Sequence, residues 1–160
     1  MTPIALRRLA FLFLSLLAWS AAPLQAQREK LPSDDLDIVE KKWPNAKRTY
    51  TGLRYVVVKP GKGSGTAEPG MVATVLYKGM LLDGTVFDES PDADHPLKAR
   101  IGRAELIEGW DEALQKMHEG EKWMLIVPPE MGYGARGKPP RIPRNATLVF
   151  EMEMVSFGRN

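Results

Sequence analysis

The sequence predicts an α+β domain, a curved antiparallel half-barrel sheet of about five to six strands wrapped around one amphipathic helix. Short runs of alternating apolar and polar residues recur from residue 52 onward and are separated by turn residues, as expected for strands. In that part of the chain, only residues 110–117 place apolar side chains at clear helical spacing. A single helix cannot cover both faces of a sheet, so we expect the sheet to curl around the helix with its outer face in solvent.

The first 26 residues have the pattern of a secretory signal peptide. Arg7 and Arg8 precede the apolar run Leu9–Trp19, and Ala26 provides a small residue at the cleavage point. The run is shorter than the roughly 20 residues of a membrane span, so we expect an exported protein of a bacterial periplasm with no stable membrane anchor. An uncleaved N-terminal anchor is the alternative, because the stretch 11–22 extends the apolar character.

The composition excludes several classes of function. The chain has no cysteine, which rules out disulfides, thiolate catalysis and cysteine-bound metals. Its formal charge of +2 falls to 0 without Arg7 and Arg8, so the charge does not indicate nucleic-acid binding. His95 and His118 lack metal-ligand spacing, and neither a nucleophile elbow nor a phosphate loop is present. We therefore expect no metal and no cofactor.

A polar arm, residues 27–50, precedes the predicted domain at residues 51–160. It contains one short predicted helix that has Ser33 as its N-cap, reaches Trp43 and is stopped by Pro44. The arm either packs Trp43 on the edge of the domain or pairs two copies of the chain. One short helix buries little surface, which favours the first interpretation.

The domain begins with an alternating strand and a hairpin. Leu53–Val58 alternates in polarity and ends at a run of turn residues. Met71–Met80 is the second predicted strand, and the two-residue hairpin signal Asp83-Gly84 leads into a third strand that reaches Phe87. The second and third strands should therefore pair antiparallel.

One further strand and the helix follow. Leu97, Ala99 and Ile101 should point inward from a strand, since they alternate with charged residues. The range 110–117 then places apolar side chains at i, i+3, i+4 and i+7, and Gly120 is positioned to end this helix.

Two amphipathic strands complete the predicted sheet, Lys122–Val127 and Thr147–Val155. The connection between them, Pro128–Ala146, contains five prolines and three glycines. A connection of this length and stiffness is usually functional.

Aromatic side chains from separate elements can converge to form either a core or an apolar pocket. The five that stand out are Tyr77, Phe87, Trp110, Tyr133 and Phe150. Periodicity alone would assign Phe87, Trp110 and Phe150 to the core. Tyr133 lies between two glycines in the long loop, where packing gives no reason for it, so we favour a site role. Asp88 fits a strand-end cap as well as a site residue.

A pocket of this kind would have no nucleophile, no metal and no obvious general base. It would be limited to a reaction that needs binding and reshaping, such as rotation about an Xaa-Pro amide. Resonance in the C–N bond gives that rotation a barrier of roughly 18–20 kcal/mol. The twisted transition state has lost this conjugation and has less charge separation, so a dry aromatic pocket binds it better than the planar amide.

Several motifs in one order resemble the FKBP-type peptidyl-prolyl isomerases, the immunophilins that bind tacrolimus and rapamycin. The resemblance extends from Gly52 to Phe157. The segments that carry it are Tyr77–Leu81, Asp83–Asp88, Ile101–Trp110, Gly132–Ala135 and Ile142–Phe150.

The resemblance implies a proline pocket between the half-barrel sheet and the helix. Trp110 would be its floor. The Tyr133 phenol would donate a hydrogen bond to a substrate carbonyl, the Ile107 N–H would hold a second one, and Asp88 would be a polar group at the rim. These three would be the catalytic residues. The remaining substrate-binding residues would be Tyr77, Phe87, Leu97, Leu106, Ile107, Ile142 and Phe150.

The implied partners are proline-containing unfolded or extended polypeptides and macrolides such as tacrolimus or rapamycin, with no nucleic acid. The alternative function is a non-catalytic peptide-binding chaperone or adaptor of the same fold. Joint retention of the predicted site residues favours the enzyme. The long loop also carries four cations, which favour acidic segments around the proline. They are Arg136, Lys138, Arg141 and Arg144.

Overall fold

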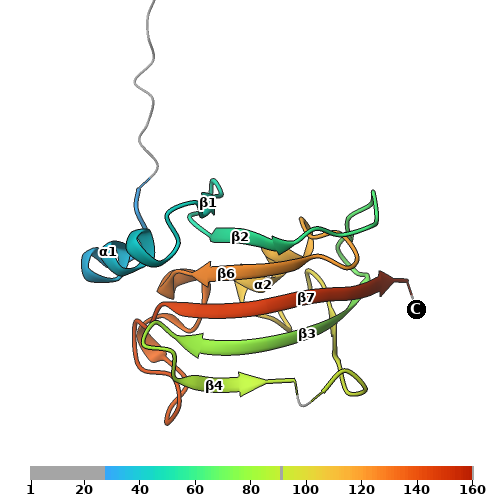
Figure 1. The fold of residues 1–160 in the computed structure, drawn as a ribbon. Helices are drawn as coiled ribbons and strands as arrows, with labels where there is room; N and C mark the ends of the chain where they lie inside the picture. Colours follow the sequence, from blue (N-terminus) through green and yellow to red (C-terminus); the bar gives the residue numbers. More distant parts are fainter. Residues whose placement is uncertain (1–27, 91, 160) are drawn as a thin grey trace, which may run out of the picture.

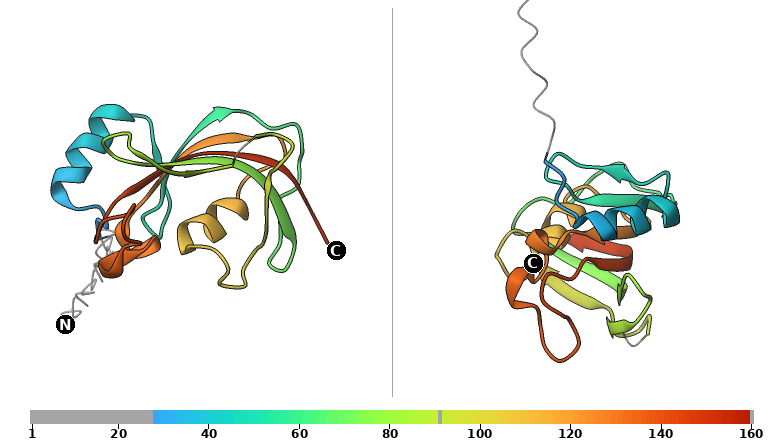
Figure 2. Two further views of the ribbon diagram at one scale, coloured as in Figure 1. Left: turned by 90° about the horizontal axis from the view of Figure 1, so that it is seen from below. Right: turned by 90° about the vertical axis from the view of Figure 1, so that its left-hand side faces the viewer.

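The computed structural model describes residues 28–90 and 92–159, so the signal peptide predicted for residues 1–26 lies outside the described residues. An open, curved antiparallel sheet surrounds one helix, which confirms the predicted α+β class (Figures 1 and 2). Neither helix of the described residues is long and apolar enough to cross a membrane. In chain order the elements are α1 (Ser33–Lys42), β1 (Lys47–Arg48), β2 (Arg54–Lys59), β3 (Val72–Leu81), β4 (Val86–Glu89), β5 (Leu97–Arg100), α2 (Glu108–Leu114), β6 (Lys122–Val127), the short 3-10 helices η1 (Pro129–Met131) and η2 (Gly134–Arg136), and β7 (Leu148–Gly158).

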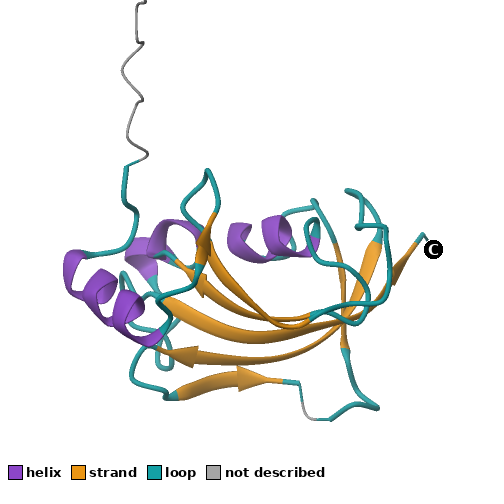
Figure 3. Cartoon of the chain, turned by 45° about the horizontal axis from the view of Figure 1, so that its top comes forward, coloured by secondary structure: helices purple, strands orange, loops and turns teal. Residues whose placement is uncertain are grey.

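The sheet has the order β1-β2-β6-β7-β3-β4, and β5 also pairs with β3. β3 and β7 form the central pair along the whole length of β3. Val75, Leu125 and Met152 are fully buried and pack in one core with Trp110 and Leu114 of α2. The concave face of the sheet and α2 therefore share a single hydrophobic core (Figure 3).

Two short strands, β4 and β5, pair with different parts of the same edge of β3. β4 pairs with residues 78–80 of β3, and β5 pairs with residues 72–75. β4 ends at Glu89 and β5 begins at Leu97, so strand pairing along this edge of β3 is interrupted between Val75 and Lys78. Phe87 of β4 and Leu97 of β5 consequently lie on either side of this interruption, which is where the site described below opens.

All six predicted strands are present, as β2 to β7. β6 has the predicted bounds, β7 continues to Gly158, and a seventh strand, β1, comes from the arm. The hairpin between β3 and β4 is longer than the predicted two residues. The Leu81 N–H bonds to the Thr85 carbonyl at 2.9 Å and the Gly84 N–H to the Leu81 carbonyl at 3.0 Å. Gly84 adopts a φ of 91°, which suits glycine in this wider turn.

The helix differs from its prediction at both ends. α2 spans Glu108–Leu114 rather than the predicted range 110–117. Met117 lies beyond the end of α2 and is nevertheless fully buried, so its apolar character reflects the core rather than the helix. Gly120 does not end the helix; it lies in the turn before β6 with a φ of 79°.

The arm covers part of the convex face of the sheet. Val39 of α1 and Leu31 pack with Ile126 of β6, and all three are buried. Trp43 is half-buried against this cluster, as the first interpretation of the arm expects. Ile126 belongs to this cluster and not to the core around α2, so the expectation of a solvent-exposed outer face is wrong at this end of the sheet. Figure 2 shows α1 beside this end of the sheet.

Candidate functional site

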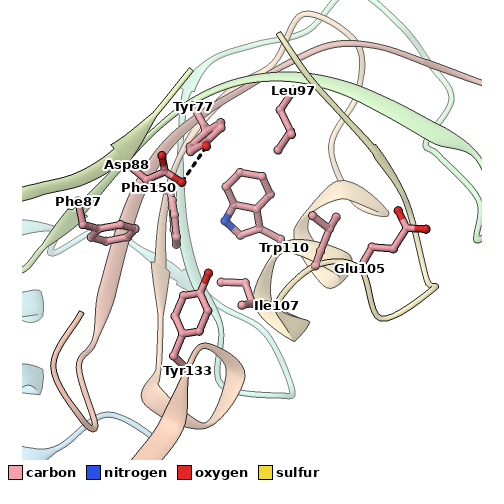
Figure 4. A pocket seen from close by; sticks show the side chains of 10 residues that line it. Tyr77, Phe87, Asp88, Leu97, Glu105, Ile107, Trp110, Tyr133 and Phe150 are labelled. Carbon is pink, nitrogen blue, oxygen red and sulfur yellow. Dashed lines mark hydrogen bonds between the residues drawn. The ribbon is translucent and has the colours of Figure 1, made fainter. Parts of the chain in front are cut away.

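The site is a cavity between the concave face of the sheet, the start of α2 and the long loop, with a volume of about 340 Å³. We call it the main cavity. Figure 4 shows its side chains converging from these separate elements. The lining residues are Tyr77, Phe87, Asp88, Leu97, Glu105, Leu106, Ile107, Trp110, Tyr133 and Phe150.

Aromatic rings form the floor and one wall of the main cavity by packing edge to face. The Trp110 ring lies 4.9 Å from that of Tyr77 and 5.2 Å from that of Phe150, centroid to centroid, and Phe87 contacts Phe150 at 5.6 Å. Such contacts stabilise each ring pair by about 0.5–1.5 kcal/mol beyond area burial. These rings belong both to the core and to the pocket: Phe87, Trp110 and Phe150 are buried, Tyr77 is half-buried, and together they line a cavity.

Gly79 of β3 allows two of these rings to approach the backbone. A Cβ at this position would lie 2.6 Å from the Phe87 ring and 2.9 Å from the Phe150 ring. These distances are shorter than a methyl group tolerates. The wall formed by Phe87 and Phe150 therefore depends on a glycine at position 79.

The indole N–H of Trp110 is buried and has no hydrogen-bond partner among the described residues. Leaving such a donor unpaired costs about 1–3 kcal/mol, and sites of this kind in native proteins call for an explanation such as a ligand. The Trp110 ring lines the main cavity, whereas its indole nitrogen is covered by the surrounding side chains.

Tyr77 and Asp88 are joined at the rim of the main cavity. The Tyr77 hydroxyl donates a 3.0 Å hydrogen bond to Asp88 Oδ2, drawn as a dashed line in Figure 4. Burial of the ring, and then this bond to the carboxylate, raise the pKa of Tyr77 to about 12. The phenol therefore stays protonated and donating. Asp88 is exposed and lies at the position expected of a rim residue, although its catalytic role remains a prediction.

Tyr133 is placed by the hydrogen-bonded loop between β6 and β7. Its carbonyl accepts the Gly137 N–H at 3.0 Å, and the Asn145 N–H bonds to the Gly134 carbonyl at 2.8 Å. Figure 4 shows its hydroxyl directed into the main cavity. The Lys138 ammonium lies 5.5 Å from the centroid of the Tyr133 ring. The loop thus holds a phenol donor at the site, as the sequence predicts.

Ile107 immediately precedes α2, so its backbone belongs to the orphan groups of a helix start. Its carbonyl accepts the N–H groups of Trp110 at 3.0 Å and Asp111 at 3.1 Å. Within residues 28–90 and 92–159 its own N–H donates to no other group. This N–H is consequently available for the second substrate carbonyl that the resemblance implies.

Ile142 is the one predicted site residue that does not line the main cavity. It is buried and lines a neighbouring cavity of about 280 Å³, which we call the side cavity. The backbones of Lys138 and Ile142 bond to each other in both directions, at 2.9 and 3.0 Å, and close a turn. The side cavity is lined by Phe87, Asp88, Tyr133, Lys138, Pro139, Pro140, Arg141 and Ile142.

Glu105 lines the main cavity and was not predicted. Its carboxylate accepts the Arg100 N–H at 3.3 Å. The sequence did offer one indication that Glu105 lines the site, because it directly precedes the predicted site residues Leu106 and Ile107. A charged, exposed residue in a loop gives no pattern that periodicity can detect.

Comparison with known proteins shows a family match and several relatives. Residues 63–155 match the model of the family described as FKBP-type peptidyl-prolyl cis-trans isomerase. The chain is 43% identical over 107 residues to FK506-binding protein 1A of Aspergillus fumigatus, covering 67% of this chain and 96% of that protein. It is also 43% identical over 104 residues to the peptidyl-prolyl cis-trans isomerase Fkbp12 of Drosophila melanogaster, covering 65% of this chain and 96% of that one.

A solved structure shares the fold. The crystal structure of FkpA from Escherichia coli superposes with a TM-score of 0.68 at 37% identity. The match covers 78% of this chain and 59% of that chain.

Proposed function

Because the chain belongs to the FKBP-type peptidyl-prolyl cis-trans isomerase family and is such an isomerase, we propose that it accelerates Xaa-Pro rotation in exported proteins while they fold. The observation that carries the proposal is the open, ring-lined main cavity with a phenol donor directed into it. Uncatalysed rotation takes tens to hundreds of seconds, which is slow enough to limit folding.

The geometry fits binding of a twisted prolyl amide. A proline ring on the Trp110 face would be surrounded by Tyr77, Phe87 and Phe150 and shielded from water. The Tyr133 hydroxyl and the Ile107 N–H would bond to the two carbonyls that flank the ring. A site that excludes water and fixes both carbonyls favours the less conjugated, twisted amide over the planar one.

Export is supported by the first 26 residues and by the lack of cysteine. The basic start, the short apolar run and Ala26 fit a cleaved leader, and a chain without thiols cannot form wrong disulfides in an oxidising compartment. We place the mature protein in a bacterial periplasm. Cell fractionation with N-terminal sequencing tests this: we expect a periplasmic chain that begins at Gln27, and a full-length chain retained in the cytoplasm would contradict it.

Macrolides such as tacrolimus or rapamycin are proposed ligands of the same cavity, since a relative is named for binding FK506. Such a ligand would compete with prolyl peptides for Trp110 and its neighbouring rings. Titration of isomerase activity with tacrolimus tests this, and activity that is unaffected at saturating macrolide would contradict it.

The folding role is tested with an unfolded protein whose refolding is limited by a proline. We expect catalytic amounts of the isomerase to shorten the slow refolding phase, and Trp110→Leu to lose this effect. A chain that binds the unfolded protein in proportion to its amount, without shortening the phase, would instead be the non-catalytic chaperone or adaptor.

A further inference from the structure

The long loop carries a cluster of positive charge that the fold itself does not neutralise. Four exposed cations lie within nine residues of this loop. In the part of the chain that the structure describes, none of them forms an ion pair with a carboxylate. They are Arg136, Lys138, Arg141 and Arg144.

Two of these cations, Lys138 and Arg141, line the side cavity, and the other two do not. The side cavity and the main cavity share Phe87, Asp88 and Tyr133 as lining residues. A polypeptide whose proline lies over Trp110 and whose carbonyl reaches Tyr133 therefore meets the side cavity next along its chain.

Both cations are held in place at this boundary. Arg141 Nη1 donates a 3.0 Å hydrogen bond to the carbonyl of Phe87, which ties the loop to β4. The guanidinium has further N–H donors in a planar fork that suits a carboxylate. The Lys138 ammonium lies over the Tyr133 ring in a cation–π contact, 5.5 Å from the centroid. The cations are therefore already positioned before a ligand binds.

The carboxylates near these cations are few. Asp88 lines the side cavity and accepts a hydrogen bond from the Tyr77 hydroxyl. Glu89 follows it on β4, and both carboxylates line a further hollow together with Arg141. On the opposite side, Glu105 lines the main cavity but not the side cavity. The side cavity thus has two cations, Lys138 and Arg141, and one carboxylate, that of Asp88. The far side of the main cavity has the carboxylate of Glu105.

We propose that the side cavity is a subsite for a Glu or Asp side chain within two residues of the proline, on the Tyr133 side of the substrate. This rests on the proposed function, because it assumes that a prolyl peptide occupies the main cavity. Lys138 and Arg141 hold the substrate carboxylate, and Glu105 disfavours a second acidic residue at the far side.

The test is a panel of prolyl peptides. Each carries Glu, Gln or Lys at one of the four positions that lie within two residues of the proline on either side. Exchange rates measured by NMR give kcat/KM at low and at high salt. We expect the kcat/KM of a Glu peptide to exceed that of its Gln counterpart by about two- to fivefold at low salt on one side of the proline, and this preference to shrink at high salt.

Matched variants separate a subsite from a general field effect. The Lys138→Glu/Arg141→Glu variant should reverse the ranking toward Lys peptides, while Arg136→Glu/Arg144→Glu changes the charge equally and should keep the ranking. Lys138→Gln/Arg141→Gln, which retains amide donors, should abolish the preference without reversal. Thermal unfolding of each variant shows that it is folded.

Three results would overturn the proposal: an unchanged ranking in the Lys138→Glu/Arg141→Glu variant, equal shifts in both charge-reversed pairs, or a wild-type chain indifferent to Glu. An uncharged Ala-Pro peptide distinguishes failure of the subsite proposal from failure of the proposed function. If its exchange is accelerated while the panel is flat, only the subsite fails; if it is not accelerated, the proposed function fails.

Discussion

The Tyr77 hydroxyl lies 3.0 Å from Asp88 Oδ2 and donates a hydrogen bond to it, joining β3 to β4 at the rim of the main cavity. The bond fixes the carboxylate of Asp88 and one wall of the cavity together. It also explains part of the raised pKa of Tyr77, since ionisation of the phenol would place a second negative charge beside Asp88.

This relationship predicts a loss of stability at alkaline pH. The ordinary pKa of 10.0 applies to Tyr77 in the unfolded chain, and the folded value is about 12. Between these pH values the folded state keeps a proton that the unfolded state releases, so the free energy of unfolding falls as pH rises. In the Tyr77→Phe variant we expect the free energy of unfolding to depend less steeply on pH between these two values. Urea unfolding from pH 9 to 12 measures this pH dependence. If the free energy of unfolding fell equally steeply with pH in both proteins, the raised pKa would not belong to Tyr77.

Gly79 should be indispensable for the wall of the main cavity. Gly79→Ala pushes a methyl group into the rings of Phe87 and Phe150, so we expect about 1–3 kcal/mol of destabilisation and a lower kcat/KM. Gly158→Ala is the matched control in the neighbouring strand β7, because a Cβ added at this position would have no atom within 4 Å. Chemical denaturation and peptide exchange measure both effects. Equal behaviour of the two variants would show that the close approach is unimportant.

The arm should contribute to the stability of the whole chain. Val39 is fully buried against Ile126, whereas its neighbour Ile38 on α1 is 40% exposed. We expect Val39→Ala to lower the free energy of unfolding by about 2 kcal/mol. Ile38→Ala should change it by less than about 0.5 kcal/mol. A Val39→Ala protein as stable as wild type would mean that the arm is only loosely attached.

The strands were the most predictable part of the fold. The bounds of β6 were predictable because Trp123, Leu125 and Val127 alternate along it and are buried in the core that it shares with α2. The same strand also shows what was missed. Met124 and Ile126 are apolar on the face expected to be in solvent, which was a signal that another segment covers it, but alternation cannot say which segment. That contact joins β6 to an arm far away in the sequence.

The start of α2 and the place of Ile142 had weaker signals. Ile107 offers no capping side chain, so the helix start gave no Ser, Thr, Asp or Asn pattern to detect. Ile142 shares a motif with Phe150, yet Phe150 lines the main cavity and Ile142 lines the side cavity. A proline-rich loop has no periodicity, so its path depends on hydrogen bonds that only the folded chain reveals.

The most direct test of the central claim is the NMR exchange rate of Ala-Pro, Leu-Pro and Glu-Pro peptides with the wild-type chain, Tyr133→Phe and Trp110→Leu. The ring-lined cavity predicts accelerated exchange by the wild type. It predicts a loss of about three- to tenfold in Tyr133→Phe, from one missing hydrogen bond, and a loss of more than about tenfold in Trp110→Leu. Folded variants that exchange the peptides as fast as the wild type would contradict the claim that this cavity is where the prolyl bond turns.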